Sequence, residues 1–142
     1  MSNALYPAAK RALMNKQIDL VNDVINIALV KDTYTFNVSH SNYTTDIVTP
    51  TFLVGTPVAL TGKVVSDFGT PNSSPANAVF DADDPTFTAV ASGSTVESCV
   101  IYHATSGTLI AYIDAGTGLP FATNGGDVTV NFSSSITRIF AL

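Results

Sequence analysis

LIAYIDAGTGLPFATNGGDVTVNF, residues 109–132, has two ends that resemble strands and a middle that does not. The apolar residues of both ends recur at every second position, as in a strand with one buried face. Residues 114–126 between them are rich in Gly and contain Pro120, and such residues interrupt strands. The stretch therefore predicts two strands, over residues 108–114 and 128–132, joined by a long loop at one end of a β-domain.

Further strands are predicted along most of the chain, at the short spacing that is typical of antiparallel sandwiches and barrels. They cover residues 25–30, 34–38, 53–65, 78–80, 86–90, 96–103 and 136–142, with Gly55 and Gly62 interrupting the third of them. The link that ends at Gly107 predicts a hairpin, because glycine accepts a positive φ. Two polar stretches, SHSNYTTDIVTP (residues 39–50) and GTPNSSPAN (residues 69–77), are predicted to lie outside the strands.

One helix is predicted, over residues 6–15 (YPAAKRALMN). Pro7 suits its first turn, and Leu5, Ala9 and Leu13 form a narrow apolar stripe at helical spacing. About three turns are too few for a stable isolated helix, so it is expected to pack on its own sandwich or on a neighbouring subunit. The predicted fold is a single all-β domain over residues 1–142, an antiparallel, jelly-roll-like β-sandwich with one short N-terminal helix in the arm 1–16.

The charge of the chain excludes some classes of function. Only 12% of the residues are charged, about half the usual share, which suits either Thr- and Ser-lined strands or a subunit of an assembly. The net charge is −5, and no Lys or Arg occurs between Lys63 and Arg138. Because nucleic-acid binding needs a basic surface, no nucleic-acid partner is predicted.

No apolar run reaches the length of about 18 residues that spans a membrane, and the first residues lack the apolar core of a signal peptide. A cytoplasmic origin and no membrane partner are therefore predicted.

The densest group of ionisable residues is FDADDP, which contains Asp81, Asp83 and Asp84. Three carboxylates at this spacing would offer hard oxygen ligands to Ca²⁺. A complete calcium loop needs further oxygens and a terminal Glu, where this sequence has Pro85 and Thr86. A turn in which Asp side chains cap backbone N–H groups is favoured over a calcium site.

The sequence lacks residues or motifs that the sites of known enzyme classes require. A Ser-His-Asp site would need His40 or His103, but no G-x-S-x-G elbow is present, and His103 is predicted to be an ordinary exposed residue at a hairpin edge. Cys99 stands alone in the apolar run SCVIY and is predicted to be buried. A glycosidase would also need sugar-stacking Trp, which the chain lacks, besides two carboxylates drawn from Asp67, Glu97, Asp114 and Asp127. The prediction is a protein without catalytic residues, cofactor or metal.

Three segments together resemble a known family. ALYPAAKRALMNKQIDLVNDVINIALV (residues 4–30), VFDADDPTFTAV (79–90) and residues 109–132 with the closing IFAL are similar to cement, or decoration, proteins of tailed bacteriophages. The resemblance implies a non-enzymatic virion protein, assembled in the host cytoplasm, that binds the outer surface of a capsid and clamps adjacent capsomers. The implied partners are the major capsid protein and further copies of the chain itself, as a dimer or trimer.

Two contact regions are expected from this reading. Leu119, Pro120 and Phe121 are three consecutive apolar residues in the long loop, and they are predicted to touch a capsid subunit or a sister copy. Lys10 and Arg11 on the helix are predicted to face an acidic surface, the alternative being a helix that caps its own sandwich with solvated charges. Phosphate binding by the loop glycines is not favoured, because no helix follows them and no Lys or Arg accompanies them.

Two other functions stay open at this point. The first is a head–tail joining or tail component of the same kind of particle. The second is a soluble module that binds glycans or calcium.

Overall fold

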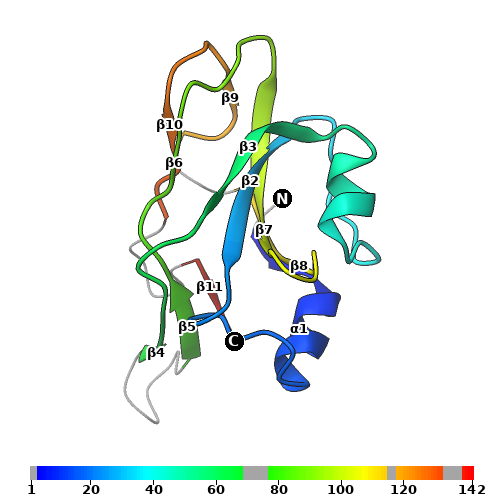
Figure 1. Cartoon of the computed structure of the whole chain (residues 1–142), viewed down its shortest axis with the longest axis vertical. Coiled ribbons are helices and arrows are strands. Elements are labelled where there is room, and N and C mark those ends of the chain that lie inside the picture. The colour runs from blue at the N-terminus through cyan, green and yellow to red at the C-terminus, as the bar shows by residue number, and fades with distance from the viewer. Residues whose placement is uncertain (1–2, 69–76, 115–117, 133–138) are drawn as a thin grey trace.

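The computed structural model describes residues 3–68, 77–114, 118–132 and 139–142 (Figure 1). The spatial order of the main antiparallel sheet is β1 (Ala4–Leu5), β8 (Leu109–Ile113), β7 (Thr95–His103), β2 (Ile25–Lys31) and β3 (Leu53–Ala59), and β9 (Phe121–Ala122) pairs with the start of β7. The smaller sheets are β4 (Val64–Phe68), β5 (Asn77–Asp81) and β11 (Phe140–Ala141), and β6 (Thr86–Phe87) with β10 (Val128–Thr129). The helical elements are α1 (Pro7–Met14) and a π-helical turn, η1 (Thr44–Val48).

The central strands of the main sheet are buried on both faces. Ile27 of β2 lies opposite Ile101 of β7, which in turn lies opposite Ala111 of β8. These side chains belong to a core cluster that includes Phe80 and Phe87 of the smaller sheets. The alternate residues of the same strands belong to a second cluster on the other face: Ala28, Val30, Val100, Tyr102, Leu109 and Tyr112. Because both faces are covered, these strands are apolar at nearly every position and not at every second one.

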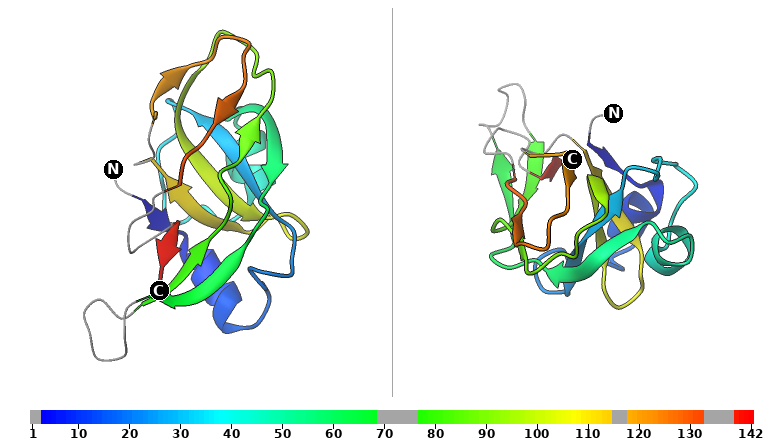
Figure 2. Two further views of the ribbon diagram at one scale, coloured as in Figure 1. Left: turned by 90° about the vertical axis from the view of Figure 1, so that its left-hand side faces the viewer. Right: turned by 90° about the horizontal axis from the view of Figure 1, so that it is seen from above.

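The layers are visible in Figure 2, in which β10 and β11 lie on one side of the main sheet and η1 on the other. The second cluster is covered by the connection from β2 to β3, residues 32–52, which contributes Tyr34 and Ile47. The predicted fold class, an all-β antiparallel sandwich with one short N-terminal helix, is confirmed. Neither helical element of the described residues has the length and hydrophobicity to cross a membrane.

The helix α1 packs on its own sandwich. Its residues Ala9 and Ala12 are buried in the first core cluster, and Tyr6, just before it, donates its N–H to the carbonyl of Ile110 in β8 (3.0 Å). Pro7 begins the helix, as predicted. The two-residue strand β1 before it pairs with β8 and was not predicted, because two residues carry no periodicity.

The strand predicted over residues 34–38 is wrong. Tyr34 is buried and Phe36 half-buried, whereas Val38 is 65% exposed, and the segment pairs with no strand in the described part of the chain. The rings of Tyr34 and Phe36 lie on the sheet, whereas the polar residues before, between and after them are exposed. The Tyr34 ring lies 5.2 Å from that of Phe52, and its hydroxyl lies 2.7 Å from that of Tyr6. Burial raises the pKa of both tyrosines.

The polar stretch 39–50 contains the turn η1, which its sequence does not predict. The carboxylate of Asp46 accepts the N–H groups of Ser41 and Asn42, both at 2.8 Å. Ile47, fully buried, is the apolar anchor of the turn. Its carbonyl accepts the N–H of Phe52 (3.0 Å), and the turn is thereby joined to the residue before β3.

Other predicted bounds shift. Residues 53–65 form β3 and the start of β4 with a turn between them, and β6 and β10 are shorter than predicted. Gly107 has the predicted positive φ (+75°) in the hairpin between β7 and β8. The strand β9 lies within the predicted loop. Residues 69–76 and the predicted strand residues 136–138 fall outside the described part of the chain.

The strand β3 forms one edge of the main sheet. Gly55 has a φ of +67°, and the register of β3 against β2 shifts between Ile27 and Leu29. Pro57 follows in the same strand. The strand β3 is therefore irregular along the outer edge of the main sheet. A regular strand there would expose a continuous row of N–H groups.

Gly62→Ala is expected to lower the free energy of unfolding by more than Gly55→Ala does. Both glycines have similar positive φ values, +61° and +67°, and this conformation costs other residues about 1–2 kcal/mol. A Cβ on Gly62 would lie 2.5 Å from the Asp83 carboxylate, whereas one on Gly55 would lie at an ordinary 3.7 Å from Val90. Urea unfolding of both variants measures the difference, and equal losses would contradict the predicted clash with Asp83.

Cys99 is buried, as predicted. Burial raises the pKa of its thiol to about 12, so that the side chain stays protonated at neutral pH. A buried protonated thiol is a poor nucleophile, and Cys99 serves as a small apolar residue of the first core cluster.

Candidate functional site

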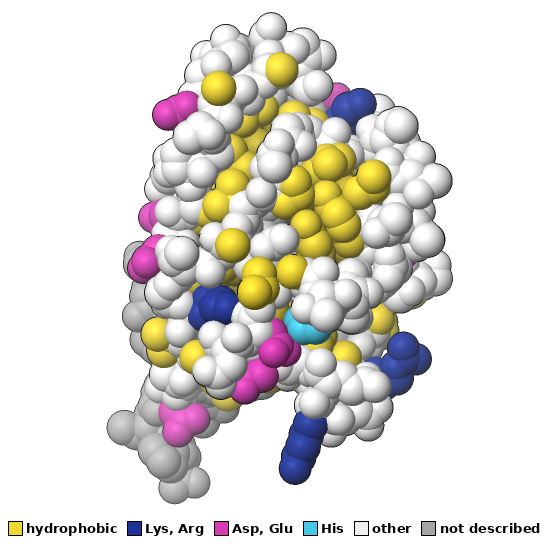
Figure 3. All heavy atoms as spheres, in the orientation of Figure 1, with side chains coloured by type: hydrophobic (Ala, Val, Ile, Leu, Met, Phe, Trp, Pro, Cys, Tyr) yellow, Lys and Arg dark blue, Asp and Glu magenta, His cyan; other side chains and the backbone are white. Residues whose placement is uncertain are grey.

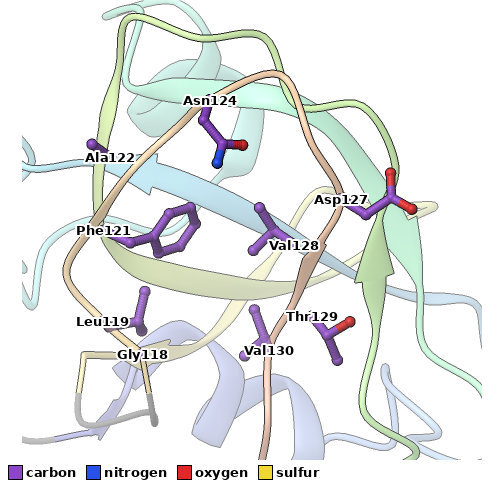
Figure 4. Close-up of a pocket in the computed structure, with 9 residues that line it drawn as sticks. All are labelled: Gly118, Leu119, Phe121, Ala122, Asn124, Asp127, Val128, Thr129 and Val130. Carbon is purple, nitrogen blue, oxygen red and sulfur yellow. The ribbon is translucent and has the colours of Figure 1, made fainter.

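A partly open hollow of about 320 Å³ is lined by residues of the segment 118–130 (Figure 4). Its lining residues come from both sides of the loop and from β10: Gly118, Leu119, Phe121, Ala122, Asn124, Asp127, Val128, Thr129 and Val130. Figure 4 shows the side chains of Phe121 and Val128 pointing toward one another across it, with the amide of Asn124 above them. The hollow thus has an apolar floor and polar groups at its rim.

Hydrogen bonds fix the turn that closes this loop. Thr123, which is buried, donates its N–H to the carbonyl of Ser94 (2.8 Å) and accepts the N–H of Ser94 on its hydroxyl (3.0 Å). Gly125 donates its N–H to the carbonyl of Val90 (2.9 Å), and Val90 donates to the carbonyl of Gly126 (3.0 Å). The loop is therefore held to residues 90–94 from both ends of its turn.

Asp127 lies at the rim but is engaged outside the hollow. Its carboxylate accepts the N–H of Ala89 at 2.9 Å. Ala89 has a φ of +48°, a conformation that few residues other than Gly adopt. This bond therefore supports an unusual turn after β6.

The three predicted contact residues of this loop do not form a free apolar tip. Leu119 and Phe121 are half-buried and pack against the first core cluster, and only Pro120 is exposed. Phe121 also begins β9, where it lies opposite Val96 of β7. The surface that this region offers to a partner is the Pro120 ring together with the rim of the hollow.

Lys10 and Arg11 are exposed on α1, on the side that faces away from the buried Ala9 and Ala12. The structure thus places the helix on its own sandwich with its charges in solvent. Figure 1 shows α1 and β9 at opposite ends of the long axis. The two predicted contact regions therefore form two separate surfaces.

The three aspartates of residues 81–84 act on the turn after β5. Asp81 accepts the N–H of Ala82 (3.0 Å), and Asp84 accepts the N–H of Phe132 (2.8 Å). Asp83 accepts the hydroxyl of Thr61 at 3.3 Å. Asp81 and Asp84 thus accept backbone N–H groups, as predicted, whereas Asp83 accepts a side-chain hydroxyl. Within the described ranges no three His, Cys, Asp or Glu side chains gather in a way that would hold a metal ion.

His103 is not the exposed residue that the sequence predicts. Its side chain is 8% exposed; Nε2 lies 3.0 Å from Asp23 Oδ2, and Nδ1 lies 2.7 Å from the hydroxyl of Ser106. Ser106 also donates its N–H to Nδ1 (3.2 Å), which places the ring proton on Nε2, facing Asp23. The sequence gives no signal of this contact, because Asp23 lies 80 positions away in the chain.

The three residue types of a catalytic triad occur together in Ser106, His103 and Asp23. Their hydrogen bonds, however, hold two turns of the chain together. The hydroxyl of Ser106 lies 2.8 Å from that of Thr108 and accepts the N–H of Thr108, so it is engaged within its own hairpin. Asp23 also accepts the N–H of Asp19 (2.8 Å). The histidine therefore joins the β7–β8 hairpin to the turn before β2, and none of these residues lines the hollow of Figure 4.

His103→Ala is expected to lower the free energy of unfolding by about 1–3 kcal/mol, because it removes the buried partner of two hydrogen-bonding groups. Thr105→Ala, at an exposed position of the same hairpin, is the matched control. Thermal unfolding followed by circular dichroism compares the two variants. Equal stabilities would show that the histidine does not lock the hairpin.

Comparisons of the chain with protein-family models, with curated proteins and with solved structures gave no match.

Proposed function

We propose that this protein is a structural component of a tailed-phage particle that binds the outer capsid surface and clamps adjacent capsomers. The observation that carries the proposal is the separation of the two candidate contact regions, at α1 and at β9, along the long axis (Figure 1). A clamp must touch two neighbouring subunits at once. A molecule with distinct surfaces at its two ends meets this requirement.

The nature of the surface also supports a role in contact. Figure 3 shows hydrophobic side chains gathered in the middle of one face, with charged groups mostly toward its margins. Only 12% of the whole chain is charged. Depletion of charge at the centre of a surface patch is typical of protein–protein interfaces, and a contiguous apolar patch marks a place that a partner covers.

The proposal includes self-association, as a dimer or trimer, and the major capsid protein as partner. Its direct test is electron cryo-microscopy of particles that carry this chain, combined with quantitative mass spectrometry of their subunits. Cementing requires density at repeated positions between capsomers and a copy number that scales with the shell. Density at one vertex or in the tail would instead assign a joining or tail component, and absence from particles would reject both.

Substitutions at the two ends are expected to weaken capsid binding without unfolding the protein. Ala122→Arg places bulk and charge at an exposed position on the rim of the hollow, and the double variant Lys10→Glu/Arg11→Glu reverses the charge of α1. We expect each to reduce affinity for capsids at least about tenfold, that is by about 1.4 kcal/mol. Co-sedimentation with capsids that lack the protein measures the effect.

Thr88→Ala, at another exposed position, is the control for these binding variants. Circular dichroism verifies that all three proteins are folded. Unchanged binding of both end variants would contradict the clamp, whereas a loss from only one would leave a protein that attaches by a single surface.

A further inference from the structure

The turn between β9 and β10 contains Asn124 followed by Gly125, the one Asn-Gly pair of the sequence. Both residues are exposed. Gly125 has a φ of +86°, and no atom would lie within 4 Å of a Cβ at this position. The space on the Cβ side of Gly125 is therefore open, and the backbone nitrogen that follows Asn124 is the group that attacks an asparagine amide in spontaneous deamidation.

The Asn124 side chain is folded back over the two residues that follow it. Its Oδ1 accepts the N–H of Gly126 at 2.9 Å, and Figure 4 shows the amide turned inward over the hollow. An N–H aimed at a carbonyl oxygen stabilises the negative charge that develops there when a nucleophile adds to the carbon. The turn thus supplies to Cγ of Asn124 the polarisation that the reaction needs.

One hydrogen bond opposes the reaction. The N–H of Gly125 donates to the carbonyl of Val90 (2.9 Å), so the proton that must leave the nitrogen is held in the folded state. The donor Gly125 lies in an exposed turn, whereas the acceptor belongs to the buried Val90, and hydrogen bonds of an exposed turn open far more readily than the core unfolds. Local opening of the turn, and not global unfolding, is then the step that exposes the nucleophile.

We infer that Asn124 is a deamidation site of the folded protein. Hydroxide or a buffer base removes the proton of the Gly125 nitrogen, which forms a bond to Cγ of Asn124. The conjugate acid of that base returns a proton to Nδ2, the bond from Cγ to Nδ2 breaks, ammonia leaves, and a five-membered succinimide remains. Water then opens the ring at either carbonyl, which gives aspartate or isoaspartate. The net change is the addition of one water and the loss of one ammonia, and no redox partner is needed.

The products change the hollow of Figure 4 in two ways. Both add a negative charge to a rim that already carries Asp127. Isoaspartate also inserts a methylene into the backbone before Gly125. The insertion displaces two groups, the N–H of Gly125, which donates to the carbonyl of Val90, and the carbonyl of Gly126, which accepts the N–H of Val90. Isoaspartate is therefore expected to loosen the loop, and aspartate to leave it attached.

The test is incubation of the folded full-length chain in mildly alkaline buffer for days, followed by peptide mapping that separates aspartate from isoaspartate. We expect Asn124 to account for most of the deamidation, at a rate that rises with hydroxide concentration. The variant Asn124→Gln, whose longer side chain would need a six-membered ring, is expected to lose that signal. Asn124→Asp reproduces the charge without the inserted methylene and is expected to keep the thermal stability of the parent.

A parallel incubation in denaturant distinguishes the outcomes. Deamidation of Asn124 in both the folded and the unfolded chain supports the inference. Deamidation in the unfolded chain alone would overturn it, because the bond to Val90 would then protect the site fully. Equal modification of the other asparagines in the folded chain would also overturn it, because the turn would then confer no reactivity of its own.

Discussion

Phe87→Ala is expected to lower the free energy of unfolding by about 3–5 kcal/mol, the usual loss when a fully buried aromatic ring is removed. Phe87 is 2% exposed and belongs to the first core cluster, between the main sheet and the smaller ones. It forms half of the two-residue strand β6 and lies opposite Val128 of β10. Removal of the ring therefore leaves a cavity and weakens β6, the only strand that pairs with β10 in the described part of the chain.

Urea unfolding followed by far-ultraviolet circular dichroism measures this loss, since the chain has no Trp to report by fluorescence. Thr88→Ala, one residue on and exposed, is expected to change stability by no more than about 0.5 kcal/mol. A loss at Phe87 no larger than that of the control would mean that the smaller sheets are not part of the cooperative core.

Ile47→Ala is expected to cost about 2–5 kcal/mol. Ile47 is fully buried and fixes η1 to the face of the main sheet that holds Val100 and Leu109. The other residues of η1 are polar except Val48, which is 38% exposed, so no second buried apolar residue of the turn replaces Ile47 when it is truncated. Val48, 38% exposed on the same turn, provides the matched variant Val48→Ala, for which a smaller loss is expected.

Native-state hydrogen exchange locates the effect of Ile47→Ala. The amide of Phe52, which donates to the carbonyl of Ile47, is expected to lose protection before the amides of β7 do. An equal loss of protection at the Phe52 amide and at the amides of β7 would contradict the prediction that Ile47 anchors the connection 32–52 separately from the main sheet.

The strands of the main sheet were predictable because their composition is apolar over a sufficient length. Residues 96–103 were predicted as a strand and form β7 with one further residue at its start. Residues 34–38 show the limit of the same signal, since a segment that packs Tyr34 and Phe36 on a sheet has a strand's periodicity without a strand's hydrogen bonds. The turn η1 was not predictable, because Ile47 and Val48 are only two adjacent apolar residues in a mostly polar stretch and have no periodicity.

The candidate site was only partly predictable. The sequence located the loop and its apolar residues, but it gave no indication that Leu119 and Phe121 turn back onto the core. The contact of His103 with Asp23 depends on where two distant turns meet, which is a property of the tertiary fold. Exposure of Lys10 and Arg11, by contrast, follows from the apolar stripe on the opposite side of the helix.

The irregular edge of the main sheet bears on the behaviour of many copies held close together. A flat strand with a free row of N–H and carbonyl groups invites another chain to continue the sheet, and repetition of that step builds fibrils. Here Pro57 has no N–H to offer, the bulge near Gly55 interrupts the row, and β1 at the other end of the sheet is only two residues long. A neighbouring molecule held at high local density therefore finds no long, regular strand at either described edge of the main sheet to extend.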